Sequence, residues 1–297
     1  MLISHSRWKN NASERNKMSQ NVKNRIEWID YSKGILIILV IAGHAIPEFD
    51  LHLDYLAHFI YSFHMPAFFI LSGYLFRYKK DLNTVEFAKK KAKQLLIPYI
   101  IFCVLIFLCH LAKQLVLGTD AKFFTMLKTK KHILGTIFMI RDSVFSNMWF
   151  LPAIFSAFCM LYVIFQISKD EKMRAMMCMV VGLLGLLWGK AELTALPISM
   201  EAGMLAVSFM YVGYVINTFK IDNYFGYRWV EGSSICFLLL INYLSHNVLR
   251  YRQDSFYNVT FSNIFLFIVT AMIGLITVVG FSKYLHNSKY LSYLGRN

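Results

Sequence analysis

Charged residues are scarce in this sequence, and that scarcity limits the class of protein it encodes. Only 16% of the 297 residues are Asp, Glu, Lys or Arg, against about a quarter in soluble domains. Hydrophobic residues make up 57% of the chain, and its mean hydropathy is +0.48. Apolar runs of about 18 residues or more recur along the sequence, as they do where helices cross a membrane. The composition therefore indicates a polytopic membrane protein and argues against a soluble domain.

Several recognisable site motifs are also missing. The five cysteines all lie inside apolar runs without a Cys-x-x-Cys spacing, which indicates small buried side chains and no disulfide framework. The sequence has no GxGxxG or P-loop phosphate motif, no HExxH and no GxSxG. Its nine histidines show no repeating metal-ligand spacing. We therefore expect no metal cofactor.

The beginning of the chain lacks the features of a signal peptide. Residues 1–24 are polar and basic, with neither an apolar core nor a small-residue cleavage site. We expect a flexible basic cytoplasmic tail over residues 1–24, followed by a single transmembrane domain over residues 25–297. No internal repeat and no second domain is visible in the sequence.

The expected fold class is all-α, a transmembrane helical bundle of about eight spans and at most nine. A short interfacial or re-entrant helix is expected around residues 132–140. Gly73 and Gly213 are expected to allow close packing between helices. The predicted spans are about 26–47, 56–78, 94–117, 148–168, 173–189, 194–217, 230–249 and 258–282.

The basic residues indicate how the bundle is oriented. The net charge of +14 would also suit a nucleic-acid partner, but the basic residues lie between the spans and not on one polar face. With the N-terminus inside, the inner segments hold 22 Lys and Arg residues and the outer segments hold 9. The positive-inside rule thus predicts a cytoplasmic N-terminus. We expect contact with membrane lipids and none with nucleic acid.

Two apolar runs near the start each carry one histidine, His44 and His64. Ionisable side chains inside a membrane are costly and are commonly tied to function. Lys33 and His44 are eleven residues apart, close to three helical turns, so they share one helix face about 16 Å apart along the axis. In the predicted orientation both histidines lie in the outer halves of their spans, where they could face a common cavity.

These residues also carry a family resemblance. The pattern Asp30-x-x-Lys33-Gly34…His44, followed by SFHMPAFF over residues 62–69 and Ser-Gly-Tyr over residues 72–74, resembles the integral-membrane acyltransferase-3 superfamily. The pattern is most similar to the branch named for fucose 4-O-acetylases. The resemblance implies a cytoplasmic-membrane enzyme that transfers an acyl group, usually acetyl, from acetyl-CoA to a hydroxyl of a surface polysaccharide or lipid-linked glycan.

The resemblance also implies roles for individual residues. His44 would be the base that takes a proton from the sugar hydroxyl. His64 would bind the acceptor hydroxyl or the developing oxyanion. The phosphates of acetyl-CoA would contact Lys33, Lys90, Lys91 and Lys93, and Arg25 and Asp30 would orient the start of the first helix.

The chain departs from the family pattern at three places. Lys33 stands where the family usually has arginine, and Gln94 stands where a further arginine is common. Residues 290–297 match a phrase that leads into one more membrane helix in the family, so we expect that last helix to be missing here.

Alternative interpretations remain for each part of the pattern. A buried histidine is often satisfied by a backbone carbonyl, Lys33 can extend to the membrane surface or pair with Asp30, and the lysines of residues 89–93 suit an anchor on anionic lipids. As a whole, the chain could instead be a transporter or flippase with a histidine proton relay, or a structural membrane subunit. The sequence gives no indication of the acceptor sugar or of the oligomeric state.

Overall fold

The computed structural model describes residues 26–48, 53–118, 121–140, 144–249, 256, 258–285 and 288–296. Every regular element among these residues is a helix. The predicted tail and Arg25 lie outside the described residues. The α-helices are α2 (Glu27–Glu48), α3 (Asp54–Tyr61), α4 (His64–Tyr74), α5 (Thr84–Leu117), α6 (Ala121–Leu127), α7 (Lys130–Ile137), α8 (Phe150–Ile167), α9 (Glu171–Lys190), α10 (Met200–Thr218), α11 (Arg228–Tyr243), α12 (Ile264–Tyr284) and α13 (Lys289–Arg296).

Seven helical segments among the described residues are long and apolar enough to cross a membrane, which confirms the all-α polytopic bundle. They correspond to seven of the eight predicted spans. The eighth prediction, residues 230–249, falls on α11, whose 16 residues are continued by the π-helical turn Leu244–Val248. The helical stretch 228–248 therefore reaches the roughly 20 residues that a span needs.

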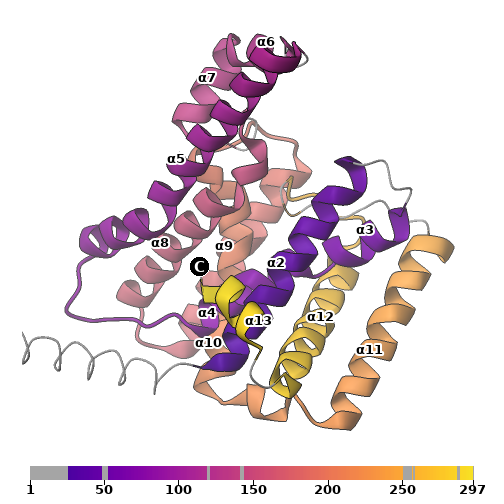
Figure 1. Ribbon diagram of the computed structural model, residues 1–297. Helices are drawn as coiled ribbons and strands as arrows, with labels where there is room; N and C mark the ends of the chain where they lie inside the picture. The colour runs from indigo at the N-terminus through magenta and orange to yellow at the C-terminus, as the bar shows by residue number, and fades with distance from the viewer. Residues whose placement is uncertain are drawn as a thin grey trace, which may run out of the picture.

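The long helices lie side by side in a bundle (Figure 1). We call the end of the bundle where α2 begins the inner end, following the predicted orientation, and the opposite end the outer end. Helix α10 packs on α4, α8 and α9, while α11 packs on α12 and α13 packs on α2. Helix α5 rises along one side and carries α6 and α7 at the outer end (Figure 1).

The contact between α4 and α10 depends on two glycines. A Cβ atom at Gly73 would lie 1.8 Å from the carbonyl oxygen of Met210, and one at Gly213 would lie 1.9 Å from the carbonyl oxygen of Ile70. Each glycine thus lets the backbone of one helix touch the backbone of the other. Gly73 and Gly213 therefore allow the close packing that the sequence predicted.

The second predicted span is interrupted. Helix α3 ends at Tyr61 and α4 begins at His64, with Phe63 in a non-helical conformation between them. Pro66 explains the interruption, because it has no N–H to donate to the carbonyl of Ser62, and its ring would clash with that carbonyl in a continuous helix. The break turns the start of α4 so that His64 is its first residue. The helix also ends at Tyr74, earlier than the predicted limit of residue 78.

Helix α5 begins ten residues before the predicted start of the third span. Asn83 and Glu86 form a capping box, in which the Asn83 side chain accepts from the Glu86 N–H at 2.8 Å. This arrangement satisfies two N–H groups that a helix otherwise leaves without partners. The lysines of residues 89–93 therefore lie on the first turns of a helix and point in different directions around it. The short helix predicted around residues 132–140 corresponds to α7, which α6 precedes.

Candidate functional site

The outer ends of α2, α3 and α4 bring three ring side chains together. His44 lies on the last turns of α2 and is exposed, whereas His64 is only 2% exposed. The ring of Tyr61, the last residue of α3, lies between them. Its centroid is 6.4 Å from that of His44 and 5.1 Å from that of His64, with near-perpendicular planes in both cases. The two motif histidines are thus neighbours through one tyrosine.

The surroundings of His64 define its tautomer. Its Nδ1 lies 2.7 Å from the carbonyl oxygen of Ile60. A carbonyl oxygen only accepts hydrogen bonds, so Nδ1 carries the proton and donates it. In the neutral ring Nε2 then has a free lone pair and acts as an acceptor. This bond is available because the break before α4 prevents the Ile60 carbonyl from continuing the helical pattern.

Lys33 and His44 lie on the same face of α2. Lys33 is half-buried on the first turns of the helix, and Ile41, one turn before His44, is 62% exposed. At 1.5 Å per residue, Lys33 and His44 are about 16 Å apart along the axis. One helix therefore presents a cation near the inner end and an imidazole near the outer end, with apolar side chains between them.

The inner end gathers basic residues from α2, from the segment after α4 and from α5. Lys33 lies close enough to Lys91 for their charges to repel each other. The Lys91 ammonium lies 3.8 Å from the centre of the Phe158 ring on α8, a cation–π contact that directs it into the bundle.

Lys90 and Lys91 line a cavity of about 230 Å³, which we call the first basic cavity. Arg77 and Lys79, from the segment that follows α4, line it as well. Among the described residues, those lining this cavity include no carboxylate. Four cations around one small cavity favour a phosphate or another anion.

The remaining predicted site residues lie apart from this cavity. Lys93 is exposed on α5 and does not belong to the described lining of the first basic cavity. Asp30 is buried on α2, and its carboxylate lies 3.8 Å from the Arg296 guanidinium of α13. This ion pair links α13 to the inner end of α2. Arg25 lies outside the described residues.

Three residues at these positions were not singled out by sequence reasoning. Tyr61 immediately precedes the SFHMPAFF motif, so its proximity to His64 was available as a signal, whereas its contact with His44 depends on how α2 packs. Arg77 and Lys79 were counted only as positive charges of an inner loop, and nothing in the sequence assigned them to a cavity.

Metal ligands do not cluster in the part of the chain that the structure describes. No group of three or more His, Cys, Asp or Glu residues there could hold a metal ion. The chemistry of the described site residues is that of imidazole, phenol and ammonium groups, which suits proton transfer and anion binding.

Two nodulation proteins are similar to part of this chain. The nodulation protein NolL of Mesorhizobium japonicum is 30% identical over 169 residues, covering 52% of this chain and 39% of that protein. The nodulation protein NolL of Sinorhizobium fredii is 38% identical over 110 residues, covering 33% of this chain and 29% of that protein. The matches therefore span well under half the length of these relatives. No solved structure matches the chain significantly.

The family profile covers much more of the chain. The profile of the acyltransferase domain family matches residues 26–297, which include every helix described above. Because this match extends over nearly the whole chain, the family is established independently of the shorter matches to individual relatives. The chain is a multi-pass membrane protein that belongs to the acyltransferase-3 family.

Proposed function

We propose that this acyltransferase moves an acetyl group from acetyl-CoA to a sugar hydroxyl, with His44 as the general base. The acceptor would be a surface polysaccharide or a lipid-linked glycan, and the protein would lie in the cytoplasmic membrane with its N-terminus in the cytoplasm. The observation that carries the proposal is the arrangement of α2. At one end of this helix Lys33 lies near Lys91 of the first basic cavity, and at the other end lies the His44–Tyr61–His64 group.

The inner end suits the donor. Coenzyme A carries a diphosphate, and the first basic cavity offers Lys90, Lys91, Arg77 and Lys79 to neutralise it. Lys33, which lies near Lys91, adds a further cation where the donor would enter the bundle. Lys93 lies on the exposed side of α5. It would not contact the donor and would only add to the positive electrostatic potential at the inner end.

The separation between the two ends has a chemical purpose in this proposal. About three helical turns, or roughly 16 Å, separate Lys33 from His44. This length is of the order of the extended pantetheine arm that links the diphosphate of coenzyme A to its thioester. With the nucleotide held at the inner end, the acetyl group can reach the outer imidazole along the open face of α2.

The transfer itself needs one base and one acceptor site. His44 takes the proton of the sugar hydroxyl while the oxygen attacks the thioester carbonyl. The carbon–sulfur bond breaks, the proton returns to the thiolate, and the products are the acetyl ester and free coenzyme A. His44 lies close to the outer end of α2, the end from which the acceptor would arrive.

The tautomer of His64 favours one of the two roles expected for it. Since Nδ1 donates to Ile60, Nε2 accepts hydrogen bonds and has no proton to offer an oxyanion. It therefore suits a hydroxyl of the acceptor sugar. Tyr61, in contact with both imidazoles, would help to hold them in position.

The test is transfer of labelled acetyl from acetyl-CoA by the purified protein to total cell-envelope glycan. We expect label in glycan with the wild-type chain and none with His44→Ala. The matched control is His246→Ala, which removes an imidazole at the same end of the bundle but next to Tyr55 and His58. Full transfer by His44→Ala would refute the base assignment. Transport of an unmodified solute that does not depend on acetyl-CoA would favour a carrier instead.

A further inference from the structure

A second depression lies beside the first basic cavity at the inner end of the bundle. It has a volume of about 530 Å³ and is lined from the inner ends of α8, α9 and α10 and the segment after α4. We call it the second basic cavity. The two cavities share Phe76 and Arg77. Ligand pockets usually measure about 300–1,000 Å³, so the second cavity has the size for a small organic group, whereas the first, at 230 Å³, is smaller.

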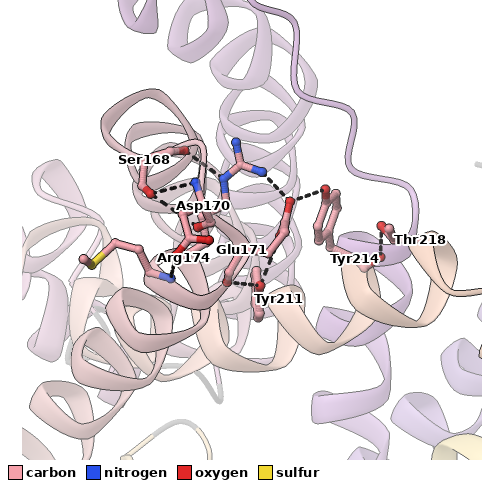
Figure 2. Close-up of polar contacts among 8 residues, drawn as sticks. Ser168, Asp170, Glu171, Arg174, Tyr211, Tyr214 and Thr218 are labelled. Carbon is pink, nitrogen blue, oxygen red and sulfur yellow. Dashed lines mark hydrogen bonds and ion pairs between the residues drawn. The ribbon is translucent and has the colours of Figure 1, made fainter.

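Cations predominate in the second basic cavity. Arg77, Arg174 and Lys220 line it, and the described lining residues include no carboxylate. The carboxylate of Glu171, on the first turn of α9, is engaged by Arg174, Tyr211 and Tyr214 (Figure 2). It lies 2.5 Å from the Arg174 guanidinium and accepts hydrogen bonds of 3.2 Å from the hydroxyls of Tyr211 and Tyr214.

The hydrogen bonds of Arg77 and Lys220 go to neutral groups. Arg77 donates to the backbone carbonyls of Tyr74 and Phe76, and Lys220 donates to the side-chain oxygen of Asn217 at 3.0 Å. These partners are neutral. Asp222, two residues after Lys220, pairs with Lys283 of α12 at 3.7 Å. A dianion in the second cavity would therefore meet two cations that no described carboxylate offsets.

The backbone at Lys220 supports a specific placement of its side chain. Its φ of +55° lies in the left-handed region, which residues with a Cβ adopt uncommonly. This conformation turns the chain back after α10, so that the ammonium reaches Asn217 on the last turn of that helix. A residue in the left-handed region just after the C-cap is a common way for a helix to end.

Two tyrosine rings add an apolar surface to the same cavity. Tyr78 and Tyr214 both line it, and Tyr214 packs edge-on against Phe165 at 4.8 Å between ring centroids. The hydroxyl of Tyr214 is occupied by Glu171, which leaves its ring as the part available to a ligand. Aromatic rings of this kind stack on nucleobases irrespective of base identity.

We propose that the second basic cavity binds the 3′-phosphoadenosine half of the acyl donor, with its 3′-phosphate between Arg77 and Lys220. The diphosphate then lies in the first basic cavity, and Arg77 contacts both phosphate groups from the segment that the cavities share. The adenine ring lies against Tyr78 or Tyr214. This assignment rests on the proposed use of coenzyme A as donor. It adds Lys220 to the residues that recognise the donor and gives Arg77 a second phosphate contact.

The experiment compares two donors that differ only in the 3′-phosphate. The KM of the purified full-length chain is measured for acetyl-CoA and for acetyl-3′-dephospho-CoA. For the wild type we expect a KM about tenfold higher with the dephospho donor, as for the loss of one charge-assisted hydrogen bond to phosphate. Lys220→Gln is expected to raise the KM for acetyl-CoA about tenfold and to leave that for the dephospho donor within about twofold.

Two further variants separate charge recognition from a structural effect. Lys220→Arg keeps the charge and is expected to restore discrimination between the donors. Lys172→Gln removes a lysine from the exposed side of α9, at the same end of the bundle but outside the described lining of the cavity, and should change neither KM. If Lys220→Gln raises both KM values equally, or if the wild type treats both donors alike, the assignment is wrong.

A binding measurement distinguishes this assignment from the proposed function. Adenosine 3′,5′-bisphosphate is titrated calorimetrically into the wild type and into Lys220→Gln, without any acceptor. Binding that Lys220→Gln weakens about tenfold supports the site even if no acetyl transfer from acetyl-CoA is found. Transfer from acetyl-CoA together with equal binding by both proteins would leave the proposed function standing and overturn the assignment.

Discussion

Replacing Gly213 by alanine introduces a methyl group into the contact between α4 and α10. The new Cβ would lie 1.9 Å from the carbonyl oxygen of Ile70 and 2.7 Å from the backbone nitrogen of Tyr74. Ordinary contacts begin near about 3.5 Å, so the two helices must separate by about 1.5 Å. Both neighbouring atoms belong to the backbone of α4, and no side chain can rotate to relieve the overlap.

The expected cost follows from two opposing effects. Overpacking costs up to about 3 kcal/mol, and replacing a helical glycine by alanine returns about 1 kcal/mol. The free energy of unfolding should therefore fall by about 2 kcal/mol, which lowers the midpoint of thermal unfolding by roughly 4–8 °C for a chain of this size. Because α4 begins with His64 and leads to Arg77, its displacement should also reduce acetyl transfer.

Intrinsic tryptophan fluorescence during heating of the detergent-solubilised protein measures this shift. Gly232→Ala on α11 is the matched control, because its Cβ would meet no atom within 4 Å on an exposed helix face. This control should unfold at the wild-type temperature or slightly above it. A Gly213→Ala chain that unfolds no earlier than the wild type, with full activity, would refute the reasoning about the α4–α10 contact.

Two other predictions concern the site residues. Lys91→Met should raise the KM for acetyl-CoA about tenfold, whereas Lys93→Met should raise it less than about twofold, since Lys91 lines the first basic cavity and Lys93 does not belong to its described lining. Equal effects of the two variants in steady-state kinetics would place the donor elsewhere. His64→Phe removes the imidazole donor to the Ile60 carbonyl, which keeps only the longer bond from the Phe63 N–H at 3.4 Å. This loss should cost about 1 kcal/mol, and the variant should raise the KM for the acceptor while the KM for the donor stays constant. A change in the donor KM alone would contradict an acceptor role for His64.

Much of the helical arrangement could be predicted from hydropathy, because a span must present an apolar surface along its whole length. The helix boundaries that differ from the predicted ones depend on short sequence motifs. Asn83 and Glu86 have the spacing of a capping box, so the early start of α5 was visible in the sequence. Pro66 marked the break before α4, but a proline within an apolar run also occurs in continuous, kinked spans.

Part of the candidate site could be predicted from the sequence, and part depends on how the helices pack. Lys33 and His44 lie on one helix, so their common face follows from the helical period alone. The position of the Tyr61 ring between the two histidines depends on how α2 packs against α3. No local sequence pattern specifies that packing. The second basic cavity joins residues from Phe76 to Lys220, and their proximity follows from the close contact of α4 with α10 at Gly73 and Gly213.

The central claim is that a donor bound at the inner end delivers its acetyl group to the outer imidazole of α2. Sealed vesicles of known and opposite orientation test it, with labelled acetyl-CoA outside the vesicle and the label in glycan as the readout. The account predicts transfer by vesicles whose inner bundle end faces the added acetyl-CoA, no transfer by intact vesicles of the other orientation, and none in either with His44→Ala. Equal transfer by both orientations while the vesicles remain sealed would contradict it.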